Sequence, residues 1–381
     1  MSVTGRRRPF GRSRVGDLVD RASIAENWRG LMCVLVFFVV CFLTACQQQG
    51  RVEEIAFESG PFHVVGDLRL PTGPGPHPVV LFVHGDGPNS RTSGVTYPPI
   101  MERMLRAGFA TFAWDKPGTG ESTGEIDRSR LTEQRARIVL DAMEALKARA
   151  DIDARRMGMW GISQAGYVMP RVLEQTDEVA FMIAVSCAGA PGVEQGIYLL
   201  ASQMACFGYA QERKDELVSE IRAFTLAVSY EEYVRYRRPF ADIPSFRALG
   251  RFGQRIDIPS REDWHPADSA REYYGYDPMD VIRGTSIPIL AVFGERDTQV
   301  DPVQGAEAWR EALAMAGNPR SRVLVFPATD HNILLTETGC IEEREGRSAA
   351  GWRNYAPEYL NLIEEWLAGL SGVESATTPG D

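Results

Sequence analysis

The sequence predicts an α/β protein built on a doubly wound, mostly parallel sheet that carries a helical insertion. Short apolar runs alternate with amphipathic segments along most of the chain, as strands and helices do in such a sheet. The runs at 78–84 and 179–186 are continuously apolar, which is typical of parallel strands buried on both faces. Residues 190–275 interrupt this alternation, because they are rich in helix formers and aromatic residues and contain no clear buried strand.

The overall composition is that of an ordinary globular protein. Of the 381 residues, 44% are apolar and 24% are charged, which excludes a disordered chain, a fibrous chain and a multi-span membrane protein. The length suits two domains, or one large α/β domain with an insertion. The formal net charge of −10 leaves no basic footprint for nucleic acid, so no nucleic-acid partner is expected.

The strands and helices of the predicted sheet follow one another along the chain. The extended segments 52–57 and 62–70 are separated by a Ser-Gly-Pro turn, which predicts a hairpin-like pair before the first buried strand at 78–84. The pattern then predicts strands at 109–114, 157–162, 179–186, 287–293 and 322–326, and helices at 100–107, 131–146, 163–174, 307–315 and 357–370. The helix at 131–146 has apolar residues every three or four positions, so one of its faces is expected to pack on the sheet.

The N-terminal segment differs from the rest of the chain in charge and hydropathy. Seven Arg and three acidic residues precede residue 30, and residues 31–43 carry no charge. That apolar run is too short to cross a bilayer, which needs about 20 residues, but it fits the apolar part of a secretory signal. It ends in Leu43, Thr44, Ala45 and Cys46. Small residues before Cys46 would give a peptidase access to the preceding bond, and the thiolate could accept a diacylglyceryl group.

This ending resembles the lipobox of bacterial lipoproteins. The resemblance implies that residues 1–45 are a signal peptide, that Cys46 carries palmitate-type lipid chains, and that the remaining chain is a membrane-anchored protein facing outside the cytoplasm. Because Gln47 and not Asp follows the cysteine, the outer membrane is expected in a cell with two membranes. The alternatives are an uncleaved membrane anchor and a buried helix in a chain whose start codon is mis-set. The expected organisation is therefore a leader at 1–45 and a domain at 46–381, with a lid inserted at about 190–275.

Three cysteines lie beyond the lipobox, namely Cys187, Cys206 and Cys340. In an oxidising compartment two of them could form a disulfide, and the sequence leaves the pairing open. A buried free thiol is the alternative for each of the three, and it is the state expected for Cys187.

Ser163 is the candidate nucleophile. It lies between a short apolar strand and a helix, with Gly161 two residues before it and Ala165 two residues after it. The pattern Gly-x-Ser-x-Gly in this setting is a nucleophile elbow, a turn so tight that its flanking residues must be small. Ala is small enough, and Gly166 follows directly. A helix N-cap is the alternative role for this serine.

The candidate acid and base follow in the chain order that a nucleophile elbow requires. Asp297 lies three residues after Gly294 at the end of an apolar strand, and His331 lies just beyond the last strand. The order Ser163, Asp297, His331 is that of a Ser-Asp-His triad in a sheet of this kind, where strand ends gather the site residues. Asp301 is a second candidate for the acid.

The loop after the first buried strand is the candidate oxyanion site. The backbone N–H of Asp86, or of Gly87, is expected to join that of Gln164 in holding the oxyanion of a tetrahedral intermediate. His84 begins this loop and is expected to support it by hydrogen bonding, without acting as the base. The remaining histidines are expected to be structural: His63, His77 and His265.

Several stretches of the chain resemble the α/β-hydrolase superfamily, in particular bacterial esterases and dienelactone-hydrolase-like or prolyl-oligopeptidase-like members. The matching stretches are 81–91, 113–124, 159–166 and 276–302, together with His331. The resemblance implies that the insertion is the variable lid of this superfamily. It also implies that Asp115 is a structural residue of an Asp-x-x-Gly-x-Gly-x-Ser turn.

Together these residues predict a serine hydrolase that cleaves small-molecule carboxylic esters through an acyl-enzyme intermediate. The sequence contains no metal-ligand cluster, phosphate-binding loop or dinucleotide motif, so no cofactor is expected. A serine exopeptidase of the prolyl-oligopeptidase-like type and a non-catalytic binding protein of the cell envelope are the alternatives.

Overall fold

The structure is a computed structural model that describes residues 50–240, 258–266, 272–348 and 350–371. The expected leader, Cys46 and the last ten residues lie outside these ranges. The described residues all belong to one compact unit, Gly50–Asp381, and the fold below is that of this unit. Within the described ranges, no helix has both the length and the apolar character needed to span a bilayer.

Eight strands form a single mostly parallel sheet, which confirms the predicted fold class. The strands are β1 (Val52–Ser59), β2 (Phe62–Arg69), β3 (His77–Val83), β4 (Ala110–Trp114), β5 (Ile152–Ile162), β6 (Val179–Val185), β7 (Ile289–Gly294) and β8 (Arg322–Phe326). Their order across the sheet is β1-β2-β4-β3-β5-β6-β7-β8. The first two strands form the expected hairpin, and β2 pairs antiparallel with β4, whereas the remaining neighbours are parallel.

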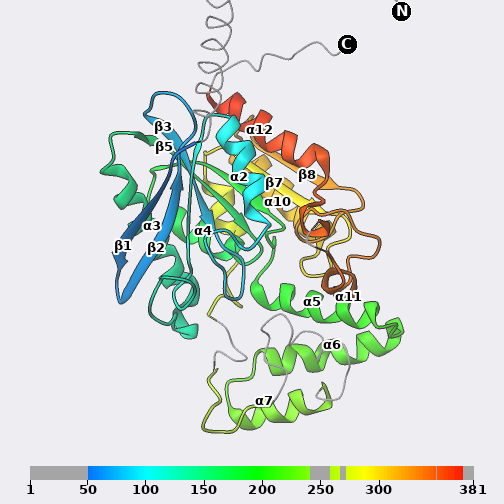
Figure 1. Cartoon of the computed structure of the whole chain (residues 1–381). Coiled ribbons are helices and arrows are strands. Elements are labelled where there is room, and N and C mark those ends of the chain that lie inside the picture. Colours follow the sequence, from blue (N-terminus) through cyan, green and yellow to red (C-terminus); the bar gives the residue numbers. More distant parts are fainter. Residues whose placement is uncertain (1–49, 241–257, 267–271, 349, 372–381) are drawn as a thin grey trace, which may run out of the picture. The chain divides into compact units, whose positions relative to one another are not determined.

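Helices cover both faces of the sheet (Figure 1). One face carries α3 (Leu131–Lys147), α4 (Ala165–Leu173), α9 (Met279–Gly284) and α10 (Pro302–Ala316), and the other carries α2 (Tyr97–Arg106) and α12 (Pro357–Ser371). Side chains of each central strand alternate between the two cores. In β3, Leu81 packs in the first core and Val80 and Phe82 pack in the second, and all three are completely buried. Burial on both faces is the reason why this strand has no polar alternation.

Two elements begin five residues earlier than the sequence pattern predicts. β5 starts at Ile152, because this residue already pairs with His77 of β3 ahead of the apolar run at 157–162. Helix α10 starts at Pro302, because the Asp301 side chain caps its first amides and Pro fits the first turn of a helix.

The insertion between β6 and β7 contains three helices of substantial length within its described part. They are α5 (Gly192–Cys206), α6 (Gln211–Thr225) and α7 (Tyr230–Arg237), and they stack on one another at one end of the sheet (Figure 1). They share a small core of their own that includes Met204, Ile221, Tyr233 and Phe240. We refer to α5, α6 and α7 as the lid helices.

Candidate active site

Ser163 lies at the tip of a tight turn between β5 and α4. Its φ of 59° is in the left-handed region, which costs a residue with a side chain free energy and marks a backbone held by its surroundings. The Ser163 N–H donates a hydrogen bond to the Val185 carbonyl at 3.0 Å, so the end of β6 holds the turn. This geometry is that of a nucleophile elbow.

Small residues allow the turn to pack closely. A Cβ added to Gly161 would lie 2.6 Å from the Cβ of Ala165, and one added to Gly166 would lie 2.7 Å from the Cβ of Cys187. Both distances are too short for real side chains. The methyl group of Ala165 therefore occupies the space left by Gly161, which explains why Ala is tolerated at the last position of the motif.

His331 and Asp297 form a buried hydrogen-bonded pair beyond the ends of β8 and β7. Nδ1 of His331 lies 2.8 Å from Oδ2 of Asp297. The other carboxylate oxygen, Oδ1, accepts hydrogen bonds from the amides of Gln299 and Val300 at 2.7 and 3.0 Å. With both oxygens engaged, the carboxylate holds the imidazole in one orientation and favours the tautomer with its proton on Nδ1.

A single cavity of about 1320 Å³ brings the nucleophile and base candidates together. Ser163 and His331 both line it, as do Asp86 of the loop after β3 and Gln164. The lid helices close one side, where Leu199 contributes to the wall. A pocket of this volume is large enough for a drug-sized molecule.

Asp301, the second candidate acid, lies in a different setting. Its carboxylate accepts hydrogen bonds from the amides of Val303 and Gln304 at 2.9 and 3.1 Å and so caps α10. The histidines expected to be structural do not line the cavity: His63, His77 and His265. Among the residues that the structure describes, no group of three or more His, Cys, Asp or Glu side chains could hold a metal ion.

The loop after β3 approaches Ser163 closely. A Cβ added to Gly85 would lie 3.4 Å from the Ser163 Cβ, so Gly leaves the loop room to come this near. The side chain of Gln164 ties the loop to the elbow, since its Nε2 donates to Asp86 Oδ1 at 3.1 Å and to the Tyr273 hydroxyl at 3.2 Å. The two expected oxyanion donors, Asp86 and Gln164, thus belong to one hydrogen-bonded network.

His84 is buried beneath this loop. Its Nε2 lies 2.6 Å from the Trp114 carbonyl and its Nδ1 lies 3.0 Å from the Tyr97 hydroxyl, so Nε2–H donates and Nδ1 accepts. Burial, with Lys116 nearby, lowers the pKa of His84 to about 3, so the ring is neutral at neutral pH. These contacts agree with the expected supporting role.

Sequence reasoning missed two buried basic residues of the site. Arg135 of α3 donates to the His84 carbonyl and to Oε1 of Gln164, and Lys116 donates to two carbonyls of the loop. A signal existed for each. Arg135 is a charged residue on the apolar face of an amphipathic helix, and Lys116 is one of only three lysines in the chain.

Asp115 organises the turn after β4, in the structural role expected of it. Its carboxylate accepts hydrogen bonds from the backbone and guanidinium of Arg91 and from the amide of Glu121. Although burial opposes them, these donors lower the pKa of Asp115. Gly120, with φ of 55°, leaves the space that the carboxylate fills.

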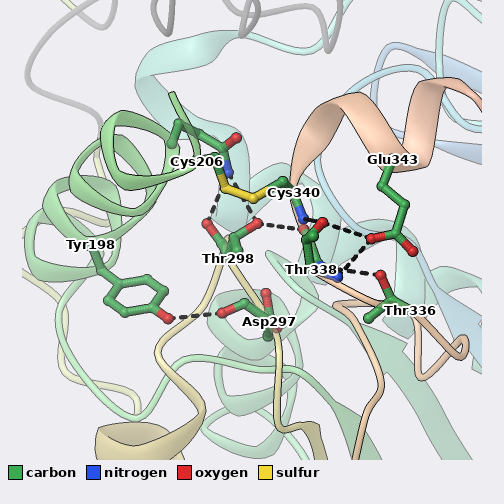
Figure 2. Close-up of a disulfide and its surroundings, with 10 residues drawn as sticks. Tyr198, Cys206, Asp297, Thr298, Thr336, Thr338, Cys340 and Glu343 are labelled. Atoms are coloured by element: carbon green, nitrogen blue, oxygen red, sulfur yellow. Dashed lines mark hydrogen bonds between the residues drawn. A yellow bond between two sulfur atoms is a disulfide. The ribbon is translucent and has the colours of Figure 1, made fainter. Parts of the chain in front are cut away.

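Lid helix α5 forms hydrogen bonds to the loop that carries the candidate acid, Asp297. Figure 2 shows the Tyr198 hydroxyl donating to the Asp297 carbonyl, at a distance of 2.8 Å. The side chain of Gln203 donates to the carbonyl and to Oγ1 of Thr298, at 3.2 and 3.0 Å. Thr298 Oγ1 in turn donates to the Gly339 carbonyl at 2.8 Å. Helix α5 therefore helps to hold the loop that carries Asp297.

A disulfide joins the same two regions. Cys206, at the end of α5, is bonded to Cys340, the residue before α11 (Ile341–Glu345) (Figure 2). This pairing answers the question that the sequence left open. Cys187 is a buried free thiol, as expected, and burial raises its pKa, so it is unreactive.

The sequence matches a protein-family model over most of its length. Residues 80–341 match the model of the alpha/beta hydrolase family. The matched span runs from β3 to the start of α11, so it contains Ser163, Asp297 and His331.

Similar proteins include esterases. Over 315 residues the chain is 23% identical to esterase EstD of Thermotoga maritima, an alignment that covers 79% of this chain and 66% of that protein. The chain thus spans just under two thirds of that relative. The solved structure of the Pyrococcus furiosus esterase Pf2001 has a TM-score of 0.51 at 16% identity, covering 84% of this chain and 91% of that one. At this identity the likeness shows the fold.

Proposed function

The chain belongs to the alpha/beta hydrolase family, and from that premise we propose that it is a serine hydrolase that cleaves carboxylic esters through an acyl-enzyme intermediate. The observation that carries the proposal is the shared cavity. Ser163 on its strained turn and His331, hydrogen-bonded to Asp297, line the same space. The esterase EstD relative supports the ester as the bond cleaved.

In the proposed reaction, Ser163 Oγ attacks the ester carbonyl and His331 Nε2 takes the hydroxyl proton. Asp297 holds the imidazole by its Nδ1–H and stabilises the imidazolium. The amides of Gln164 and Asp86 donate to the oxyanion of the tetrahedral intermediate. Its collapse breaks the ester C–O bond, and His331 gives its proton to the leaving alcohol. Water then repeats the sequence on the acyl-enzyme, releasing the acid and restoring the serine.

Full-length chain purified in detergent tests this proposal on p-nitrophenyl acetate and butyrate. We expect turnover and covalent labelling by a fluorophosphonate probe, both of which Ser163→Ala abolishes. Ser186→Ala is the matched control, because Ser186 also has a positive φ at a strand end but is completely buried and does not line the cavity. Activity retained in Ser163→Ala would refute the nucleophile assignment.

Parallel assays distinguish ester hydrolysis from the alternative functions of an exopeptidase and a binding protein. Turnover of aminoacyl-naphthylamides faster than of esters would favour an exopeptidase. A wild-type chain that neither turns over esters nor reacts with the fluorophosphonate would favour a binding protein.

We further propose that the protein is a lipoprotein of the cell envelope, anchored through Cys46. The basic segment, the short apolar run and the ending Leu43 to Cys46 support this location. The Cys206–Cys340 disulfide is also in keeping with an oxidising compartment. Metabolic labelling with an alkyne-bearing palmitate is expected to mark the wild-type chain and Cys41→Ala but not Cys46→Ala. Label retained in Cys46→Ala would refute the anchor.

A further inference from the structure

Lys116 is buried directly behind the loop after β3. Its side chain is 8% exposed, and its Nζ donates to the carbonyl oxygens of Gly85 and Gly87 at 2.7 and 2.6 Å. Burial and the nearby Arg135 lower its pKa, whereas Asp86 opposes this effect. Burying an amine costs free energy that only hydrogen bonds of this kind offset.

The two hydrogen bonds set the direction of a peptide group. In a trans peptide, the C=O and the following N–H lie in one plane and point in opposite directions. Lys116 binds the Gly85 carbonyl, so the N–H of Asp86 points away from Lys116. Gly85 itself lies against Ser163, where a Cβ would come within 3.4 Å of the Ser163 Cβ. The peptide that Lys116 orients is therefore the one beside the nucleophile.

Neighbouring side chains hold the rest of the loop in the same way. Arg135 donates to the His84 carbonyl, and Asn89 Nδ2 donates to the carbonyls of Asp86 and Gly87 at 2.9 and 3.1 Å. Each carbonyl from His84 to Gly87 thus accepts a side-chain hydrogen bond. Glycine at 85 and 87 gives the backbone little preference of its own, so the amide directions depend on these donors. Without Lys116, the Gly85 carbonyl would lose the hydrogen bond from Nζ.

We propose that Lys116 is a positioning residue for catalysis, which turns the amide of Asp86 toward the oxyanion that forms on Ser163. This inference rests on the proposed ester hydrolysis. An oxyanion donor acts on the transition state and leaves substrate binding nearly unchanged. Loss of Lys116 should consequently lower kcat and spare KM.

The test compares Lys116→Met, Lys116→Gln and wild type as full-length chains in detergent, with p-nitrophenyl butyrate. Met fills the space of the lysine without donating, and we expect kcat to fall by roughly 10- to 100-fold with KM changed less than about threefold. Gln keeps a hydrogen-bond donor on a side chain one atom shorter, so we expect a smaller fall in kcat than for Lys116→Met. Lys147→Met is the matched control, since Lys147 forms surface ion pairs with Glu144 and Glu178.

A trifluoromethyl ketone inhibitor separates positioning from a merely structural role. Addition of Ser163 to its carbonyl makes an oxyanion, so its affinity should fall by the same factor as kcat/KM. Butyric acid, the product, should bind each variant equally well. Thermal unfolding shows whether each variant is folded. If Lys116→Met does not fold, kcat and inhibitor affinity are compared between Lys116→Gln and wild type.

The proposal is overturned if a folded Lys116 variant keeps the wild-type kcat, or if kcat falls while inhibitor affinity stays unchanged. An inactive wild-type chain would instead refute the proposed function, and the Lys116 inference with it. Normal wild-type and Lys147→Met activity with a selective loss in the Lys116 variants supports both.

Discussion

Replacing both Cys206 and Cys340 by Ser is expected to destabilise the protein through its unfolded state. The bond joins residues 134 positions apart, and the chain-entropy relation for a loop of that length gives about 5 kcal/mol. The folded state should change little, because Gln203 still bonds Thr298 and Tyr198 still bonds Asp297. The loss in the free energy of unfolding should therefore lie between about 2 and 5 kcal/mol, the usual range for a native disulfide.

Urea unfolding measured by circular dichroism provides the assay. We expect the midpoint of the double variant to fall well below that of wild type, and dithiothreitol to lower the wild-type midpoint to a similar value. Dithiothreitol should leave the double variant unchanged, which serves as the control, and Cys187 contributes to neither effect because it is a free thiol. A double variant with the wild-type midpoint would refute the reasoning, since the bond would then restrict nothing in the unfolded chain.

Three further predictions follow from single contacts. Tyr198→Phe removes one hydrogen bond from the Asp297 carbonyl. The value of kcat/KM for p-nitrophenyl butyrate should therefore fall about three- to tenfold, roughly the free energy of one such bond. An unchanged kcat/KM would show that the bond does not position Asp297. Burial lowers the pKa of His84 from 6.5 to about 3, so between these values the unfolded chain binds a proton that the folded chain does not. Stability is therefore lost as pH falls through this window, by about 2 kcal/mol at pH 5 relative to pH 7, and urea unfolding should show a smaller loss in His84→Gln. In Gly120→Ala the new methyl group would overlap the Asp115 carboxylate, and Ala would have to adopt a positive φ. We expect the free energy of unfolding to fall by about 2 kcal/mol or more, measured by thermal unfolding. A wild-type melting midpoint would contradict this expectation.

The sheet could be predicted because each buried strand is recognisable from its own short stretch of sequence. A parallel strand buried on both faces must be apolar throughout, and residues 78–83 of β3 and all residues of β6 are. The gathering of Ser163, Asp297 and His331 at one edge follows from topology, since all three come after strands that run in the same direction.

Other features depend on distances that the sequence does not encode. Asp297 and Asp301 are both acids after β7, and only the folded loop shows that one contacts His331 while the other caps a helix. Cys206 and Cys340 are far apart in the chain, so their pairing requires the lid to be placed on the core. Arg135 was visible as an anomaly on an apolar helix face, but its partners were not.

The contacts of α5 limit how far this side of the cavity can move. Any displacement of this helix would pull on the Asp297 loop through Tyr198 and on the segment before α11 through Cys206. Helix α5 therefore behaves as a fixed wall of the cavity.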